Sequence, residues 1–586
     1  MKRPDCPSSS HLSSTTPNAG RTWEEIVADK QRTDAAKIPP EWVLPPAVVA
    51  GAEARRSLVG AFIEGLLDAE TCRITDMDVP DLVGLMESGA FTAVQVTTAF
   101  CRRAAVVHQL TRNMLEIGFN NALKRAAELD DYFRAHNKLI GPLHGIPFTL
   151  KDQFHIKGLE TCMAFVGWIG TFEGNKGTGK EREFESEIIK EFHRLGAIPI
   201  GKASCSPETS NNILGYLWSP HNQQLSSGGS SGGEAVMQAL KGSAFGVGTD
   251  IGGSVSMPAS FNGVFSLKPS SGRISMKDVA NTGPGQQIMP TVAGIMGRSV
   301  TTLRLVLKSL LSTEPWLQDP YVVPLPWREL EDCCPGKGLA KSKPTFGFME
   351  NDGIVIPHPP VQRALGLVKR ALQEAGYETI DWGPPSNLES LQIHGHIARG
   401  DGCPDVWRAL QLSGEPEVPQ ISGLFEPDGP RDPMSLPEYQ DVVVHMRDYR
   451  NRYQEYWMST AGLTKTGRPV DVFISPVTAT AGLLPEKFFH AEYTNSTNVL
   501  DFPTVVIPVT FVDKDIDVGD PNFKPITETD AINMAAYDAS AYHGAPAAVQ
   551  VVGRRLSEEK VLAMAELVVE ALSLCKAKGH GPSSVG

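Results

Sequence analysis

Two segments rich in glycine and serine carry the residue types that could form the reactive centre of a hydrolase. They occupy residues 228–233 (GGSSGG) and 250–254 (DIGGS). Glycine lets the backbone adopt conformations closed to other residues, so that N–H groups can come close to a bound group. Serines held in such loops are candidate nucleophiles, and the neighbouring N–H groups are candidate donors to an oxyanion. Because both segments flank apolar sequence, the pattern favours a structured site for acyl transfer over a flexible linker.

The first segment also satisfies a generic catalytic motif. Residues 228–232 match G-x-S-x-G, the nucleophile elbow of α/β-hydrolases, in which Ser230 would be the nucleophile. That motif requires a buried strand directly before it, whereas residues 221–227 (HNQQLSS) are polar. The sequence therefore favours a different use of Ser230.

A lysine follows an apolar segment upstream of the serines. Residues 146–150 (IPFTL) predict a short buried strand, and Lys151 comes directly after it. In open α/β sheets, reactive groups gather beyond the carboxyl ends of the strands. Lys151 is therefore a candidate for the same site as the serines.

The elements around these residues alternate between helix and strand. The patterns predict helices over 79–88, 92–107, 120–135, 185–195, 234–240 and 558–574, and strands over 197–201, 244–249 and 472–475. Thr22 is expected to start a surface helix that extends to residue 37. Residues 211–222 are expected to form a loop. Proline-rich loops near 315–335 and 416–437 are the expected location of substrate preference.

The chain resembles the amidase signature family of serine hydrolases in four segments: GPLHGIPFTLKD, GGSSGGE, GVGTDIGGS and FNGVFSLKPSSG. The resemblance covers roughly residues 80–575. Three further segments are similar to the fungal acetamidase-like branch: TWEEIVADKQ, IPPEW and ARGDGCPDVWRALQLSGEPEVP. The resemblance implies an α/β fold with a single large mixed β-sheet sandwiched by helices and a helical N-terminal arm.

The expected division of the chain follows from this resemblance and from composition. Residues 1–20 are rich in Ser, Thr and Pro and are expected to be disordered. Residues 21–79 would form the helical arm and residues 80–577 the catalytic domain. Residues 578–586 would be a flexible tail.

The resemblance also implies hydrolysis of a carboxylic acid amide to the acid and ammonia or an amine, through an acyl-enzyme. Ser254 would attack the carbonyl carbon, Ser230 would relay the proton, and a neutral Lys151 would act as base. Burial can lower the pKa of a lysine by several units from about 10.4, which makes this role feasible. In the family, the serine that relays the proton, here Ser230, has a cis peptide bond.

Neighbouring residues receive binding and supporting roles from the same resemblance. The backbone N–H groups of four residues would form the oxyanion hole and contact the substrate: Ile251, Gly252, Gly253 and Ser254. Ser231 would assist the hydrogen-bond network, and Asp250 would anchor the loop. Removal of one oxyanion donor costs about 10²–10³ in rate, so a glycine run here has a mechanistic reason.

The chain departs from the family next to this site. Two residues after the candidate nucleophile, where the family usually has Arg, this chain has Ser256. In the loop before the serine segment, Tyr216, Leu217 and Ser219 replace the common Arg, Thr and Asn. We interpret the chain as a divergent, active amidase whose substrate the sequence does not identify.

Composition argues against several other classes of function. The net charge of −13 with no basic block argues against a nucleic-acid partner. The nine cysteines are scattered with no C-x-x-C pair, which predicts free thiols. No apolar run reaches about 18 residues, so we expect no membrane span and a cytoplasmic location. His394 and His396, with Asp401 and Cys403, make a weak metal pattern, and neither a metal nor a cofactor is expected.

Several alternatives to a simple amidase stay open. An esterase could use the same catalytic serines. A glutaminase-type amidotransferase subunit would work with a partner that consumes ammonia. A binding protein could retain the same fold with weakened catalysis. The expected partner of an amidase is a small-molecule amide. A homodimer is a further open arrangement.

Overall fold

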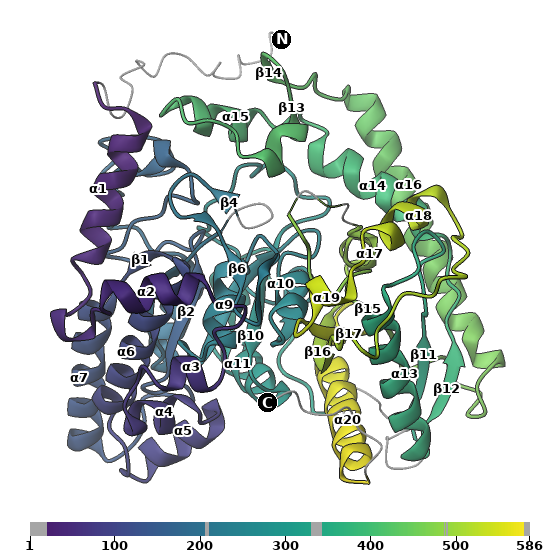
Figure 1. Ribbon diagram of the computed structural model, residues 1–586, viewed down its shortest axis with the longest axis horizontal. Coiled ribbons are helices and arrows are strands. Elements are labelled where there is room, and N and C mark those ends of the chain that lie inside the picture. The colour runs from purple at the N-terminus through teal and green to yellow at the C-terminus, as the bar shows by residue number, and fades with distance from the viewer. Residues whose placement is uncertain (1–19, 206–209, 330–342, 486, 488–489, 579–586) are drawn as a thin grey trace.

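The computed structural model describes residues 20–205, 210–329, 343–485, 487 and 490–578. Its centre is a mixed sheet of 11 strands in the order β1-β3-β2-β8-β10-β9-β16-β17-β15-β11-β12 (Figure 1). From one edge to the other, these strands are Met114–Ile117, Ile198–Ala203, Pro147–Lys151, Phe245–Asp250, Val292–Gly297, Phe265–Lys268, Thr504–Phe511, Pro546–Val552, Val472–Pro476, Thr345–Phe348 and Glu378–Asp381. This architecture is the large mixed sheet expected from the sequence.

Helices surround the sheet (Figure 1). Those of the described residues are α1 (Trp23–Ala35), α2 (Pro46–Glu53), α3 (Ala61–Glu64), α4 (Ala69–Thr75), α5 (Val79–Glu87), α6 (Ala93–Thr111), α7 (Phe119–His136), α8 (Glu187–Leu195), α9 (Gly232–Ala239), α10 (Ser256–Phe261), α11 (Val300–Leu311), α13 (Pro359–Glu374), α14 (Asn387–Arg399), α15 (Pro404–Gln411), α16 (Leu436–Ser459), α17 (Glu492–Val499), α18 (Glu528–Ala535), α19 (Ala539–Tyr542) and α20 (Glu558–Ala577).

The alternation of side chains along the strands buries both faces of the sheet. On β16, Val505 and Ile507 belong to the main hydrophobic core, which also contains Val561 of α20. Val506 points to the other face and packs in a second cluster with Val255 and Ala259. Because successive strand residues face opposite ways, one strand carries helices on both of its sides.

The candidate lysine and the second serine segment meet at one edge of the sheet. β2 pairs in parallel with both β3 and β8, and Leu150 lies opposite Val247 of β8. Lys151 is the last residue of β2, and Asp250 is the last residue of β8. Parallel strands end at the same edge, so the sheet brings these two residues to one side.

Most of the predicted elements are present, with shifts at their ends. α1 begins directly after Thr22, whose Oγ1 accepts the N–H of Glu25 (3.3 Å) while Glu25 Oε2 accepts the N–H of Thr22 (3.0 Å). This reciprocal cap explains the predicted start of the helix. The loop predicted over 211–222 is wrong in part, because short strands form there: β4 (Ser210–Asn211), β5 (Gly215–Tyr216) and β6 (Trp218–Ser219), the last paired with β7 (Asn222–Ser226).

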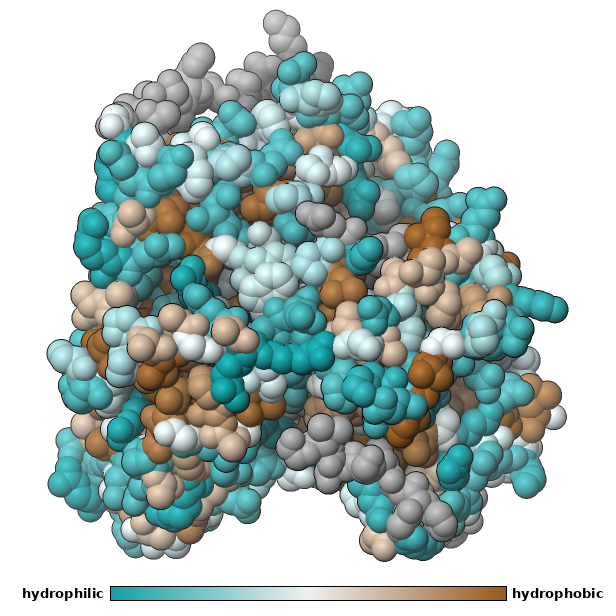
Figure 2. All heavy atoms as spheres, viewed as in Figure 1, coloured by the Kyte–Doolittle hydropathy of each residue, from teal (hydrophilic) through white to brown (hydrophobic). Residues whose placement is uncertain are grey.

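Other expectations concern the ends and the surface of the chain. The predicted disorder of residues 1–20 and the predicted tail lie almost wholly outside the described residues. Within the described ranges, no helix combines the length and the apolar character needed to cross a membrane. The visible face is largely hydrophilic, with hydrophobic side chains in scattered groups (Figure 2). The proline-rich region near 416–437 contains a 3-10 helix, η5 (Pro419–Leu424), and a short hairpin of β13 (Phe425–Glu426) and β14 (Gly429–Pro430).

Candidate active site

Lys151 is buried, with only 2% of its surface exposed. Its Nζ donates hydrogen bonds to Ser230 Oγ (2.6 Å) and Thr249 Oγ1 (2.7 Å). Thr249 Oγ1 in turn donates to Gln153 Oε1 (2.5 Å). Burial lowers the pKa of Lys151 to about 8. A lysine with this pKa is partly neutral near pH 7 and can accept a proton.

Ser230 and Ser231 lie where the chain turns from β7 into α9. The Gly229–Ser230 peptide bond is cis, as the resemblance implied. The N–H of Ser231 donates to the carbonyl of Ser254 (3.1 Å). Ser231 Oγ donates to the Thr249 carbonyl and accepts the Thr249 N–H, each at 3.2 Å. These contacts bring the two glycine-serine segments together.

Asp250 holds the loop that carries Ser254. Its buried carboxylate accepts the N–H groups of Gly253 and Val255, both at 2.7 Å. It also accepts a longer bond of 3.3 Å from the N–H of Ser256. Asn498 of α17 donates to the same carboxylate at 3.0 Å. Because one side chain takes several N–H groups of the turn, it fixes the path of the backbone through Ser254.

Side chains from α14 and α17 brace this loop from the other side. His394 contacts the carbonyl of Ile251 through Nε2 (3.0 Å), and burial lowers its pKa, so the neutral ring donates this bond. Thr494 Oγ1 donates to the carbonyl of Gly252 (3.0 Å). Gly253 has a φ of +110°, and a Cβ at this position would lie 2.3 Å from Thr494 Oγ1. Only glycine fits there, because a side chain would clash with the bracing threonine.

Five of these contacting residues were not predicted from the sequence as parts of the site: Gln153, Thr249, His394, Thr494 and Asn498. Thr249 stands directly before the DIGGS segment and Gln153 two residues after Lys151, so proximity to the motifs was a usable signal. Thr494 lies in a segment with no recognisable pattern. In the sequence, His394 stands out only as part of a weak metal pattern. Across the described residues, no group of three or more His, Cys, Asp or Glu side chains is arranged to hold a metal ion.

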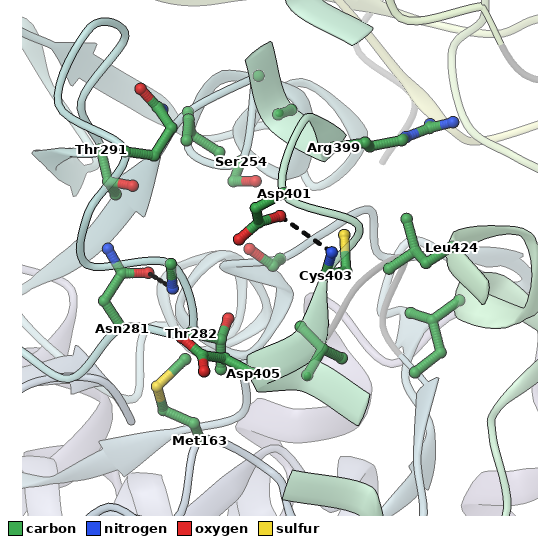
Figure 3. A pocket seen from close by; sticks show the side chains of 18 of the residues that line it. Met163, Ser254, Asn281, Thr282, Thr291, Arg399, Asp401, Cys403, Asp405 and Leu424 are labelled. Atoms are coloured by element: carbon green, nitrogen blue, oxygen red, sulfur yellow. Dashed lines mark hydrogen bonds between the residues drawn. The ribbon is translucent and has the colours of Figure 1, made fainter. Parts of the chain in front are cut away.

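A cavity of about 920 Å³ opens at these groups (Figure 3). Lys151, Ser230 and Ser254 line it together with Ile251 and Gly252. Much of the remaining wall is apolar and includes Met163, Phe165, Leu410, Val418, Ile421 and Leu424. Charged side chains also line the cavity: Arg399 at the end of α14, Asp401 in the link that follows, and Asp405 of α15 (Figure 3). The cavity can therefore hold a substrate with a sizeable apolar part.

The side chains at the positions that depart from the family contact neighbouring parts of the protein or are buried in its interior. Ser256 is buried, and its Oγ has no hydrogen-bond partner within the described part of the chain. Leu217 is buried, and Ser219 Oγ donates to the carbonyl of Phe261 (3.2 Å). The Tyr216 ring lies 4.3 Å from that of Trp218, centroid to centroid. None of these side chains can supply the positive charges of the two arginines that the family commonly has at positions 216 and 256.

Comparisons with known proteins show which proteins this chain is similar to. The family model described as Amidase matches residues 95–562. An acetamidase of Aspergillus oryzae is 38% identical over 557 residues, which cover 94% of this chain and 99% of that protein. An acetamidase of Emericella nidulans is 38% identical over 558 residues, with 94% and 98% covered. The solved structure of a fatty acid amide hydrolase superposes with a TM-score of 0.84 at 28% identity, and covers 94% of this chain and 95% of that one.

Proposed function

Because this chain belongs to the amidase family and is a hydrolase of amide C–N bonds, we propose that it works through Ser254, Ser230 and Lys151 by way of an acyl-enzyme. The observation that carries the proposal is the 2.6 Å hydrogen bond from the buried Lys151 Nζ to Ser230 Oγ, in the cavity that Ser254 also lines. Ser254 Oγ attacks the carbonyl carbon, while Ser230 accepts its proton and passes its own proton to Lys151. Lys151 then returns a proton through Ser230 to the departing amine, and water hydrolyses the ester formed on Ser254.

We assign the oxyanion hole to three backbone N–H groups instead of four. The N–H of Gly253 is already donated to Asp250 Oδ1 (2.7 Å). The N–H groups of Ile251, Gly252 and Ser254 have no acceptor among the described residues, so they are free to bind a substrate oxygen. Donors that are held in place before the reaction stabilise the developing oxyanion without a cost of reorganisation. Asp250 supports this arrangement by holding the loop.

The cavity favours an amide larger than acetamide. A volume of about 920 Å³ corresponds to the space of about thirty water molecules, whereas acetamide has four heavy atoms. The apolar wall that includes Leu410, Ile421 and Leu424 would then bury an apolar substituent. The acetamidase names of the fungal relatives are compatible with this proposal if the same groups also accept small amides.

The alternatives make different use of the same site. An esterase would share the groups, and only the ratio of amide to ester turnover separates it from an amidase. A glutaminase-type subunit would require a partner that consumes ammonia. The acetamidases align over nearly their whole length with this chain, which supports a self-contained enzyme. A binding protein on this scaffold would not react with a serine-directed probe.

A fluorophosphonate probe tests the proposal, because it forms a covalent bond with an activated serine. Wild-type protein should be labelled at Ser254, and Ser254→Ala should abolish labelling. Ser230→Ala should slow labelling because proton transfer is impaired. Ser88→Ala, at an exposed serine of the helical surface, serves as the matched control and should label at the wild-type rate. Labelling that persists in Ser254→Ala and maps to Ser230 would establish the nucleophile-elbow alternative.

A further inference from the structure

The N-terminal helix α1 packs against two loops that form part of the cavity wall, the first at residues 160–165 and the second at residues 211–214. Ile26 and Val27 of α1 share one hydrophobic cluster with Cys162, Ala164 and Ile213. Ala164 lines the cavity, with its neighbours Met163 and Phe165, as do residues 210–212. α1 therefore lies behind the cavity wall, although it precedes the part of the chain that matches the family model.

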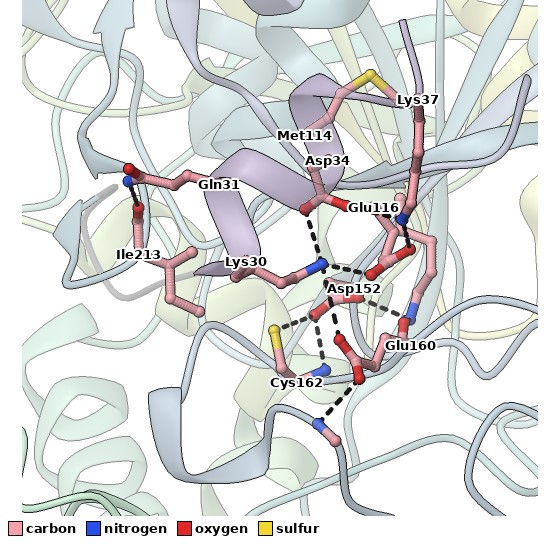
Figure 4. A network of polar contacts seen from close by, with 12 residues as sticks. Lys30, Gln31, Asp34, Lys37, Met114, Glu116, Asp152, Glu160, Cys162 and Ile213 are labelled. Carbon is pink, nitrogen blue, oxygen red and sulfur yellow. Dashed lines mark hydrogen bonds and ion pairs between the residues drawn. The ribbon is translucent and has the colours of Figure 1, made fainter. Parts of the chain in front are cut away.

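A buried network of charges connects α1 to the first of these loops (Figure 4). Lys30 Nζ pairs with Asp34 (2.7 Å), with Glu116 of β1 and with Glu160 (3.8 Å). Lys37 Nζ adds a second cation, at 2.7 Å from both Asp34 and Glu116. Lys30 is buried, and removal of one partner from a buried group of charges leaves the others uncompensated. The network thus ties the position of Glu160 to α1.

The segment that follows Glu160 is held on its other side by Asp152, which follows Lys151, and by Lys202 of the neighbouring strand β3. Lys202 Nζ donates to the carbonyl of Glu160 (2.5 Å) and to Thr161 Oγ1 (2.6 Å), and pairs with Asp152 (2.6 Å). Asp152 Oδ2 accepts the N–H groups of Cys162 (3.0 Å) and Met163 (2.8 Å). The wall residues 163–165 are therefore fixed between α1 and the residue that follows Lys151.

The second loop is held by the next residue of α1. Gln31 Nε2 donates to the carbonyl of Ile213 (2.5 Å). Asn211 Oδ1 accepts the N–H groups of Ile213 (3.0 Å) and Leu214 (2.8 Å), and Asn211 itself lines the cavity. The hydrogen bond from Gln31 thus holds the loop of residues 211–214, whose turn positions Asn211 in the cavity wall.

We propose that α1 is a positioning element of the substrate cavity, in which Lys30 and Gln31 hold two wall loops and so determine how bulky an amide the enzyme accepts. The proposal rests on the proposed amide hydrolysis. Neither side chain lines the cavity, so both act through residues 160–165 and 211–214. A small amide makes few contacts with these loops, whereas a bulky one depends on their positions. Loss of the α1 contacts should therefore weaken binding of bulky amides and spare small ones.

The test compares Gln31→Leu and Lys30→Met with Arg32→Ala, a control on the exposed side of the same helix, where Arg32 pairs with Asp29 (2.7 Å). Turnover of acetamide and of 4-phenylbutyramide is measured per active site, with active sites counted by fluorophosphonate labelling. For Gln31→Leu we expect KM for the bulky amide to rise about tenfold, and kcat/KM for acetamide to stay within about twofold of wild type. Arg32→Ala should match wild type with both substrates.

The outcomes separate this inference from the proposed function. An unchanged KM for the bulky amide in Gln31→Leu, or an equal loss on both substrates per labelled site, would overturn the role of α1. A fall in the number of labelled sites with normal kinetics per site would show that α1 contributes only to stability and would also overturn it. If Lys30→Met does not fold, Gln31→Leu alone decides. Failure of the wild-type protein to label or to hydrolyse any amide would instead reject the proposed function.

Discussion

Lys151→Ala should remove both most of the amide-hydrolysis rate and its dependence on pH between 6 and 8. Burial lowers the pKa of Lys151 from 10.5 to about 8. At pH 7 a base with a pKa of 8 is neutral in about one molecule in ten, and a base with a pKa of 10.5 in about one in 3,000. The buried site therefore raises the amount of usable base by about 300-fold. Wild-type kcat/KM should rise about tenfold from pH 6 to pH 7 and level off above pH 8.

The assay measures kcat/KM for an amide and for its matched activated ester, in both proteins and across pH. An amine leaves poorly unless it is protonated, whereas an activated phenoxide needs little help. Each general acid or base step contributes about 10²–10⁴, so the amide should lose far more activity than the ester. Lys180→Ala is the matched control, because Lys180 lies over the rings of Phe172 and Phe184 and does not line the cavity. An equal loss on amide and ester, or a variant that keeps the wild-type pH profile, would refute the role of Lys151.

Three further predictions concern stability and substrate size. Burial raises the pKa of Glu191 to about 8, and its carboxylate has no hydrogen-bond partner in the described structure. The free energy of unfolding therefore falls as pH rises from about 4.5 to 8. Glu191→Gln should raise the free energy of unfolding at pH 8 by on the order of 3 kcal/mol, with no gain at pH 4.5. The pKa of His490 is raised to about 9, because its bonds to Asp352 (2.5 Å) and Glu492 (2.8 Å) outweigh the effect of burial. The charged His490 ring therefore stabilises the fold fully below pH 6.5, and this contribution is lost as pH rises through 9. Urea titrations should show His490→Gln destabilised at pH 6 by on the order of 3 kcal/mol and little changed at pH 10. An equal loss of stability at both pH values would contradict this. Ile421→Trp should fill part of the cavity and reduce turnover of 4-phenylbutyramide while sparing acetamide, and equal turnover of the bulky amide would show that this wall does not contact substrate.

Local patterns in the sequence were enough to identify the candidate reactive residues. Ser230 and Ser254 stand in short glycine runs, and Lys151 ends an apolar strand, so each was recognisable from its immediate neighbours. The start of α1 was predictable for the same reason, because Thr22 and Glu25 cap each other across three residues. Interactions between residues close in sequence depend little on the rest of the fold. The motifs also sufficed to predict the class of fold through the family resemblance.

The tertiary structure alone decided which side chains support that centre and what surrounds it. His394 meets Ile251 across 143 residues of sequence, and Thr494 meets Gly252 across 242. Lys30 reaches Glu116 across 86 residues, and the walls of the cavity come from segments between Lys151 and Asn495. Hydrophobic periodicity indicates which face of a helix or strand is buried, but it does not say which partner that face meets. These contacts depend on the order of strands in the sheet and on how the helices pack against it, and both result from many weak interactions that no single segment of sequence contains.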